Sequence, residues 1–221
     1  MTRKGARLPR WLALLPALML GGCNSYGDST YSQYWKMLGE MWRAQANGGA
    51  ITRNQAAAIT YASMGWRLNG AREQIIVLAT DTNGDLLWTA SNRIVLVTRD
   101  GRLRRTVGLP HDLAGTTGSP PPPSEALMAP FSSKRQMDFP DMQLYGLAVE
   151  CRAAARARQT IKILGTAIAT TRVDEDCHAT GRDWNFTDMF WLGSDGMVMR
   201  ALQHVHPAGD TLLTEIFRPP G

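Results

Sequence analysis

The sequence of 221 residues lacks the motifs by which common enzyme classes are recognised. It has no phosphate-binding P-loop, no dinucleotide-binding glycine pattern and no serine nucleophile elbow. Cysteine is scarce, with three residues in all. The apolar run from Trp11 to Leu20 is broken by Pro16 and is about half as long as the roughly 20 residues that a membrane-spanning helix needs. The sequence therefore predicts no cofactor, no metal ion and no catalytic residue.

The first residues have the organisation of an export signal. A positive segment precedes the apolar run, and two glycines follow the run. Leu20-Gly21-Gly22-Cys23 resembles the lipobox of bacterial lipoproteins. This resemblance implies cleavage between Gly22 and Cys23, and acylation of the Cys23 thiol and of the new amino terminus. The alternative is an ordinary secretory signal that happens to be followed by a cysteine. The positive residues are Arg3, Lys4, Arg7 and Arg10.

Lipid at Cys23 would make the membrane a partner of this chain. Each buried methylene group contributes about 0.8 kcal/mol, so two or three acyl chains hold a protein at a bilayer far more firmly than one. The second residue of the mature chain is Asn24. In lipoproteins of this kind Asp at that position favours retention in the inner membrane. The resemblance therefore implies the outer membrane, with the protein on its periplasmic side.

The excess of basic residues belongs mostly to the signal. The chain has 24 Lys and Arg against 19 Asp and Glu, a net charge of +5. Four of the basic residues and none of the acids precede Cys23, so the mature chain carries only about +1. Such a balance gives no support for binding to nucleic acid.

The mature chain is long enough for one domain with a sizeable core. We expect a signal peptide over residues 1–22, a tether over 23–30 and a single β-rich domain over 31–221. Apolar positions spaced three and four apart between Tyr31 and Trp42 predict a helix. Thr52 and Gln55 have capping-box spacing and predict a short second helix through Ala58.

Beyond Ile59 the pattern is that of short strands. Apolar, β-branched segments alternate with turn dipeptides such as Asn83-Gly84 and Asp100-Gly101, which favour hairpins. Residues 149–168 have helical propensity but mostly alternate with period two, and we favour a strand or hairpin there. The predicted fold is mainly β, with antiparallel meander or barrel-like sheets and one or two short N-terminal helices. The strand-like segments are 61–68, 73–80, 86–91, 93–98, 103–109, a hairpin over 189–207 around Asp195-Gly196, and 211–219.

A proline-rich segment divides the domain. Residues 115–130 contain four consecutive prolines, which cannot donate hydrogen bonds to a sheet. We expect a long exposed loop without chemistry, or plain surface disorder, between an N-terminal half over 31–114 and a C-terminal half over 131–221.

Residues 75–113 resemble the YjbF/GfcB family of group 4 capsule and exopolysaccharide lipoproteins. The resemblance lies in an aliphatic strand, a Trp-bearing strand and the stretch from Thr98 to Leu109, which fits T-x-x-GRLxRTxGL. Residues 51–68 and 190–219 are similar to further parts of the family pattern, whereas 115–160 departs from it. The resemblance implies a β-rich outer-membrane lipoprotein encoded among genes for surface polysaccharide. It implies no catalytic mechanism.

The two remaining cysteines form a candidate disulfide. Cys151 and Cys177 are the only cysteines of the mature domain apart from Cys23. In an oxidising periplasm such a pair is expected to be bridged where geometry allows. The alternative is two buried thiols.

Arginines, tryptophans and histidines are the candidates for ligand contact. Arg99, Arg102, Arg104 and Arg105 cluster around one hairpin and can meet an acidic polysaccharide, or can simply protect an edge strand from aggregation. Four tryptophans can stack on sugars, although their aliphatic neighbours favour the core. His204 and His206 lie two apart, but two ligands do not make a metal site. Asp138 and Asp141 lie in loop-like sequence, where nothing supports a glycosidase dyad. The tryptophans are Trp66, Trp88, Trp184 and Trp191.

Three functional hypotheses follow. The first is a non-catalytic, lipid-anchored lipoprotein that assists production or export of capsule or exopolysaccharide. It would work by contact with polysaccharide-export proteins, or by holding acidic glycan through Arg102, Arg104 and Arg105. The second is a hydrolase or lyase that modifies polysaccharide. The third is a structural envelope lipoprotein without a glycan role.

Overall fold

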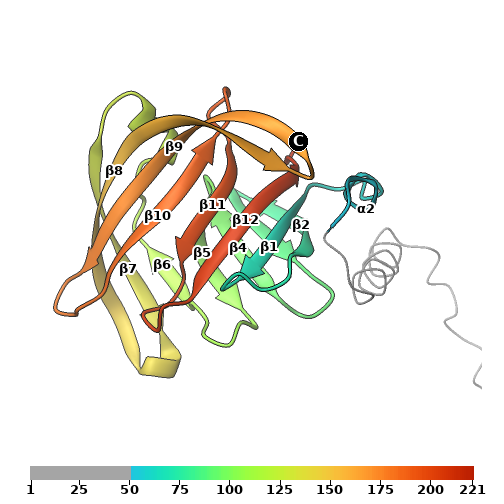
Figure 1. Cartoon of the computed structure of the whole chain (residues 1–221). Helices are drawn as coiled ribbons and strands as arrows, with labels where there is room; N and C mark the ends of the chain where they lie inside the picture. Colours follow the sequence, from blue (N-terminus) through green and yellow to red (C-terminus); the bar gives the residue numbers. More distant parts are fainter. Residues whose placement is uncertain (1–50) are drawn as a thin grey trace, which may run out of the picture.

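The computed structural model describes residues 51–221, so Cys23 and the helix expected from Tyr31 lie outside the described residues. Twelve antiparallel strands form one sheet that curls into a nearly closed barrel (Figure 1), which confirms the predicted fold class. No helix in this part of the chain is long and apolar enough to cross a membrane. In chain order the elements are α2 (Arg53–Ala57), β1 (Ser63–Leu68), β2 (Gln74–Thr82), β3 (Asp85–Thr89), β4 (Val95–Arg99), β5 (Arg102–Val107), β6 (Gly115–Thr117), the 3₁₀ helix η1 (Pro123–Leu127), β7 (Phe131–Phe139), η2 (Pro140–Met142), β8 (Leu144–Ile163), β9 (Thr166–Ala179), β10 (Asn185–Leu192), β11 (Val198–His204) and β12 (Thr211–Arg218).

The hairpin turns and the helix α2 form where the sequence predicted them. Thr52 and Gln55 form both bonds of a capping box at the start of α2. Asn83, Gly84, Asp100 and Gly101 all have positive φ, which the hairpin turns β2–β3 and β4–β5 require. Residues 149–168 are extended, in the hairpin of β8 and β9, so the preference for strand over helix is confirmed.

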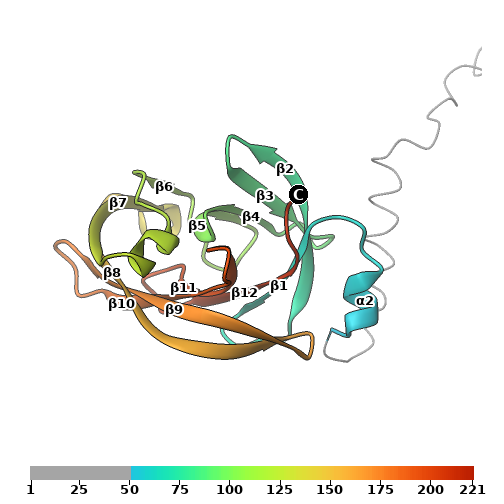
Figure 2. The same ribbon diagram turned by 90° about the horizontal axis from the view of Figure 1, so that it is seen from above.

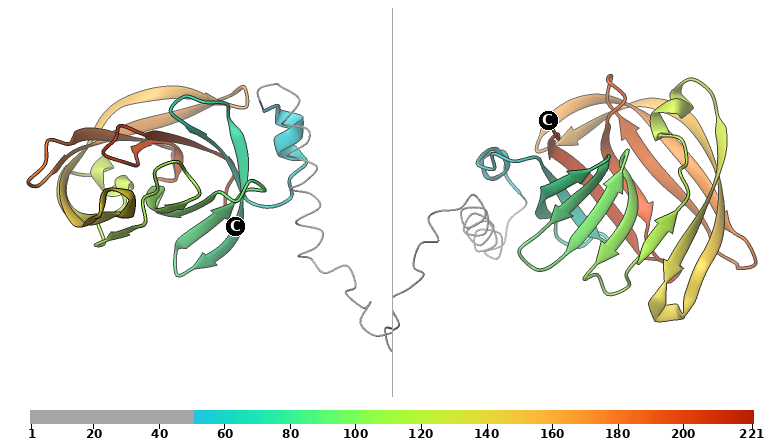
Figure 3. Two further views of the ribbon diagram at one scale, coloured as in Figure 1. Left: turned by 90° about the horizontal axis from the view of Figure 1, so that it is seen from below. Right: turned by 180° about the vertical axis from the view of Figure 1, so that it is seen from behind.

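The strand order determines where the barrel closes and where it stays open. The order is β5-β4-β3-β2-β1-β12-β11-β10-β9-β8-β7-β6, so the first and last strands pair in the middle of the sheet. The two edges of the sheet are β5 and β6, which are neighbours in sequence. They meet on the side seen from behind in the right-hand view of Figure 3.

The proline-rich segment is the physical reason for this opening. β6 has only three residues, and Gly118-Ser119 and four prolines follow it. Prolines lack the N–H that a ladder needs, so the chain beside the start of β5 cannot pair with it. Arginine side chains take over instead: Arg102 Nη1 donates to Pro121 O and Arg104 Nη1 donates to Gly118 O, each at 2.6 Å.

The segment 115–130 is only in part the exposed loop that the sequence predicts: residues 117–119 and 127–130 are exposed, whereas Pro123 and Ala126 are buried. After the prolines the chain turns inward as η1, which packs inside the ring of strands at one end of the barrel (Figure 2). The segment does not have the sequence pattern of a core segment, because its apolar contacts come from four strands distant in sequence, β8 to β11. Ala126 packs in a cluster with Ala153, Val173, Phe190, Leu192 and Ala201.

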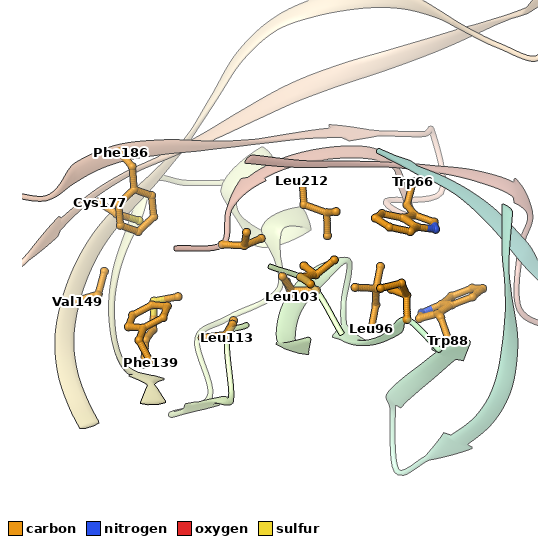
Figure 4. Close-up of a cluster of buried hydrophobic side chains, with 14 of the residues drawn as sticks. Trp66, Trp88, Leu96, Leu103, Leu113, Phe139, Val149, Cys177, Phe186 and Leu212 are labelled. Carbon is orange, nitrogen blue, oxygen red and sulfur yellow. The ribbon is translucent and has the colours of Figure 1, made fainter. Parts of the chain in front are cut away.

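The main core fills the barrel from wall to wall. In Figure 4, Trp66 and Leu212 face Trp88 and Leu96 across the interior. Trp66, Trp88 and Trp184 are all less than 10 % exposed, which agrees with the core alternative for the tryptophans rather than with sugar stacking. The indole of Trp191 is half-buried, donates to Gln159 Oε1 at 2.8 Å and lies under the guanidinium of Arg200.

The long β8–β9 hairpin covers part of the outer wall. A register shift between Ala155 and Arg158 bends the hairpin, and its distal half crosses outside β10, β11 and β12 toward α2 (Figure 2). Its tip at Leu164 packs on the cluster that joins α2 to β2, and Arg53 donates to Thr166 Oγ1 at 2.7 Å. The sheet therefore has two covered faces here, which is why residues on both faces of β1 and β12 are buried.

Candidate functional site

The opening between the edge strands holds a small basic slit. We define the basic slit as the cavity of about 140 Å³ between β5 and the segment after β6. Four arginines line it, and burial lowers the pKa of the Arg104 guanidinium below its usual range, with Asp85 opposing that shift and the neighbouring arginines adding to it. The slit combines fixed positive charge with hydroxyl and carbonyl groups, a chemistry suited to acidic or hydroxylated ligands. Its lining includes Arg99, Arg102, Arg104, Thr116, Ser119, Pro120 and Arg135.

Behind the slit lies a buried network of two arginines and two acids. The Arg102 guanidinium binds both carboxylate oxygens of Glu175, and its Nε lies 3.1 and 3.2 Å from them. Arg135 bridges Glu175, at 3.4 Å, to Asp188, at 3.0 Å. The backbone N–H of His204 donates a hydrogen bond to Asp188 Oδ1 at 2.8 Å. Both acids are therefore neutralised by fixed cations inside the barrel.

This network corrects one of the glycan contacts expected from the sequence. Arg102 is 4 % exposed and is held by Glu175, so it is not a surface arginine that can bind glycan. Arg104 is half-buried and lines the slit, whereas Arg105 is exposed on the outer wall. The pairing of β4 with β5 contains a bulge between the pairs Val97–Arg105 and Thr98–Leu103. Because of this bulge Arg104 lines the slit whereas Arg105 is exposed on the outer wall. Strand alternation alone did not predict this separation.

A second cavity lies at the η1 end of the barrel. We call it the apolar pocket; its volume is about 460 Å³ and it lies among β1, β3, β12, η1 and the turns β4–β5 and β10–β11. The polar atom of its tryptophan is satisfied, because Trp88 Nε1 donates to Thr98 Oγ1 at 2.9 Å. The walls carry hydrocarbon and thioether groups, including Met64, Leu86, Trp88, Met197, Met199 and Ile216.

The opposite end of the barrel carries a histidine cluster. His111, between β5 and β6, stacks on His206 at 4.8 Å between ring centroids. His111 Nδ1 lies 2.7 Å from Asp210, and His206 Nε2 lies 3.1 Å from Asp141. Ala208 N–H donates to His206 Nδ1, so the hydrogen-bond network places the proton on Nε2. The cluster joins three loops and closes this end.

The histidine cluster is also a set of donors that can hold a metal ion. One ligand atom each from His111, His206 and Asp210 lies within 4.8 Å of the others. His111 Nδ1 and both ring nitrogens of His206 already have partners within the protein. The pair His204 and His206 noted in the sequence does not converge, because His204 faces Asp188 instead. A second set, Cys151, Glu175 and Cys177, cannot supply thiolates because its two sulfurs are bonded to each other.

The paired carboxyls do not lie in an open cleft. Glu73 and Glu215 share a hydrogen bond, and burial and then Glu215 raise the pKa of Glu73 to about 7. Their side chains are 16 % and 6 % exposed. Asp138, from the dyad considered in the sequence, accepts from Gly146 N at 2.7 Å, and Asp141 faces His206. These positions give a hydrolase no matched pair of acids facing a common space.

Comparisons with known proteins show the family of this chain. The family model described as group 4 capsule polysaccharide lipoprotein GfcB, YjbF matches residues 38–217. The chain belongs to the YjbF family. It is similar to the uncharacterized lipoprotein GfcB of Escherichia coli K12, with 25 % identity over 195 residues, which are 85 % of this chain and 87 % of the relative. Its fold is similar to the crystal structure of the hypothetical E. coli lipoprotein YmcC, with a TM-score of 0.69 and 21 % identity over 81 % of this chain and 95 % of that one.

The stretch that carried the family resemblance has a structural role in this member. In the YjbF-type stretch 98–109, Gly101 makes the β4–β5 turn and Leu103 and Leu109 enter the core. The Thr106 hydroxyl joins Asp112 to Leu113 N at 2.8 Å each. Together with the Arg102–Glu175 pair, these contacts fix the edge of the open side. The motif therefore builds the wall of the slit.

Cys151 and Cys177 are joined by a disulfide between the directly paired strands β8 and β9. The bridge lies at the inner wall next to Arg135, whose Nη2 is 3.8 Å from Cys177 Sγ. Sequence reasoning did not single out Arg135, Asp188 or His111 as members of any cluster. Charged residues at inward positions of strands are a usable signal, but only once the strand register is known.

Proposed function

We propose that this YjbF-family chain is a non-catalytic lipoprotein, anchored through lipid at Cys23 to the periplasmic face of the outer membrane, that assists production or export of capsule or exopolysaccharide. Membership of a family of capsule polysaccharide lipoproteins is the observation that carries this proposal. The lipobox-like residues Leu20 to Cys23 support the anchor, and Asn24 supports the outer membrane.

The pairing of acids within the described residues supports a role without catalysis. Glu175 and Asp188 are tied to arginines, and Glu73 and Glu215 are mostly buried and share a hydrogen bond. A general acid or base needs to reach its substrate within hydrogen-bond distance, which none of these buried groups can do without rearrangement.

The test is complementation of a strain that lacks the gene, with polymer output as the readout. We expect Asp141→Asn and His111→Ala, which change the accessible titratable groups of the histidine cluster, to keep full output at normal protein abundance. Loss of output at normal abundance in either variant would contradict the non-catalytic role and favour a hydrolase or lyase. Normal output without the gene would favour a structural envelope role.

Binding of acidic glycan at the open edge is one form of this function. Arg104 lines the slit and Arg105 is exposed, so both remain available after Arg102 is assigned to Glu175. We expect Arg104→Glu with Arg105→Glu to weaken retention on immobilised acidic polysaccharide. Arg152→Glu, exposed on β8, is the matched control and should leave retention unchanged. Equal retention by all three proteins would leave only contact with export proteins.

A further inference from the structure

The apolar pocket has the dimensions and lining of a ligand site that the proposed function does not use. Its volume of about 460 Å³ falls within the usual range for small-molecule sites, which are mostly apolar and often lie at the mouths of barrels. The core beside it is packed: Trp88 and Leu96 are 1 % and 0 % exposed. The pocket is therefore a distinct space next to a filled core.

The basic residue of the pocket lining, Arg200, is already engaged, so the pocket does not offer a site for an anion. The Arg200 guanidinium donates to Glu215 Oε1 through Nε, at 2.6 Å, and to Lys162 O, at 2.8 Å. The remaining charged lining residues are two acids in turns, Asp100 and Asp195. Asp195 accepts from Met197 N at 3.0 Å. A ligand with an anionic head inside the pocket would meet like charge, so recognition rests on the apolar walls.

The methionines suit a flexible hydrocarbon. Met64 comes from β1, and Met197 and Met199 come from the β10–β11 turn and the start of β11. Thioether side chains are unbranched and polarizable, and they adapt to irregular or mobile apolar ligands. Gly101 closes one side of the space, because its positive φ lets the β4–β5 turn approach so closely that an added Cβ would lie 2.6 Å from Val198 Cβ.

Two exposed apolar side chains follow the proline segment that forms one wall of the pocket. Pro122, Pro123 and Ser124 line the pocket, and η1 continues from them to Leu127 and Met128. Leu127 is 38 % exposed and Met128 is 90 % exposed. Exposed apolar side chains near a cavity are typical of surfaces that contact a membrane or another protein.

We propose that the apolar pocket binds the hydrocarbon chain of a lipid, which enters beside Pro122, Pro123 and Ser124. The lipid chain lies against Leu86, Met197 and Met199, which line the pocket and are partly exposed, and its head group stays outside the barrel. This assignment does not depend on a role in capsule production. The chain can come from a bilayer lipid or from the protein's own lipid at Cys23, and the two sources are separable.

The test uses the full chain in phosphatidylcholine vesicles that contain a phosphatidylcholine with a diazirine on one acyl chain. After illumination, we expect cross-links on peptides that contain Met64, Leu86 to Trp88, or Met197 to Met199. Leu86→Trp and Ser124→Phe fill the pocket from opposite sides and should each remove most of these cross-links. Val107→Phe adds the same bulk at an exposed position of β5 and should keep them. Near-ultraviolet circular dichroism checks that each variant is folded.

A second arm separates the sources of the hydrocarbon. Cells are fed a diazirine fatty acid, and the protein is illuminated before purification. Cross-links between pocket peptides and the N-terminal lipopeptide identify the protein's own chain, whereas cross-links to free phospholipid identify a bilayer lipid. Absence of pocket cross-links from both arms overturns the proposal, and so do cross-links that persist in both filled variants. A negative cross-linking result does not bear on the proposed polysaccharide role, because that role is tested separately by polymer output.

Discussion

Arg102 on β5 and Glu175 on β9 form a buried ion pair inside the barrel, although 73 residues separate them in the chain. Arg102 is at the edge strand of the open side, and Glu175, which is fully buried, lies on the inner face of the opposite wall. Arg135 also donates to Glu175, and the carbonyl of Pro121 accepts a hydrogen bond from Arg102. One ion pair thus holds the edge strand, the proline-rich segment and the far wall together.

Replacing Arg102 by Met should destabilise the fold strongly. Removing one partner of a buried ion pair leaves an uncompensated charge and typically costs about 3–5 kcal/mol. The measurement is urea unfolding followed by tryptophan fluorescence. Arg105→Met, on the exposed face of the same strand, is the control and should lie within about 0.5 kcal/mol of the native chain.

Adding Glu175→Gln to Arg102→Met should restore part of the lost stability, since the charge left behind is then removed. Equal stability of Arg102→Met and Arg105→Met would contradict the importance of the pair.

Loss of the disulfide should also destabilise the domain. The bridge joins Cys151 to Cys177, 26 residues apart, and the chain-entropy model gives about 3–4 kcal/mol for a loop of that length. The double variant Cys151→Ser/Cys177→Ser should therefore melt well below the native chain. Reduction with dithiothreitol should lower the melting temperature of the native chain and leave that of the double variant unchanged. A reductant effect on the double variant would show that another process is being measured.

The Glu73–Glu215 pair predicts stability that falls as the pH rises. Burial and the neighbouring Glu215 raise the pKa of Glu73 from 4.5 to about 7, against the opposing charges of Arg67 and Arg200. Between these values the folded chain holds a proton that the unfolded chain has released. The contribution of Glu73 is therefore fully present below pH 4.5 and is lost as the pH rises through about 7; its size is on the order of 1–3 kcal/mol.

The measurement is the free energy of unfolding from pH 4.5 to 8 for the native chain and for Glu73→Gln. We expect Glu73→Gln to flatten this dependence and to be the more stable protein at pH 8. Glu150→Gln is the control, because Lys134 lowers the pKa of the exposed Glu150 and the sign of its contribution is opposite. The same slope in Glu73→Gln and in the native chain would assign the dependence to other groups.

Cys23→Ser should abolish lipidation. The lipobox-like stretch predicts that the Cys23 thiol carries lipid, so the variant should accumulate as unprocessed precursor and take up no labelled palmitate. The double variant Cys151→Ser/Cys177→Ser keeps Cys23 and should incorporate label, with the amount normalised to protein abundance. Equal labelling of Cys23→Ser and the native chain would remove the basis for the anchor and for the localisation.

Short-range patterns in the sequence were sufficient to predict the local structure. Asn83-Gly84 and Asp100-Gly101 produced hairpin turns because these residues accept positive φ at little cost, and Thr52 with Gln55 produced a helix cap. Such features depend on a few neighbouring residues, so they can be recognised without a fold. The mainly β class followed from the same local patterns, and the family stretch around Gly101 was recognisable for the same reason.

Which charged residues face inward depends on the three-dimensional fold and could not be predicted from short-range patterns. β7 carries Arg135 at a core-facing position, so its alternation of apolar and polar residues is hidden, and no strand was expected there. Arg135 is stable inside because β9 and β10 bring Glu175 and Asp188 to it, and Ala126 of η1 is buried because four distant strands surround it. Burial of a charge or of a proline-rich segment depends on partners far away in the chain, which local patterns do not encode.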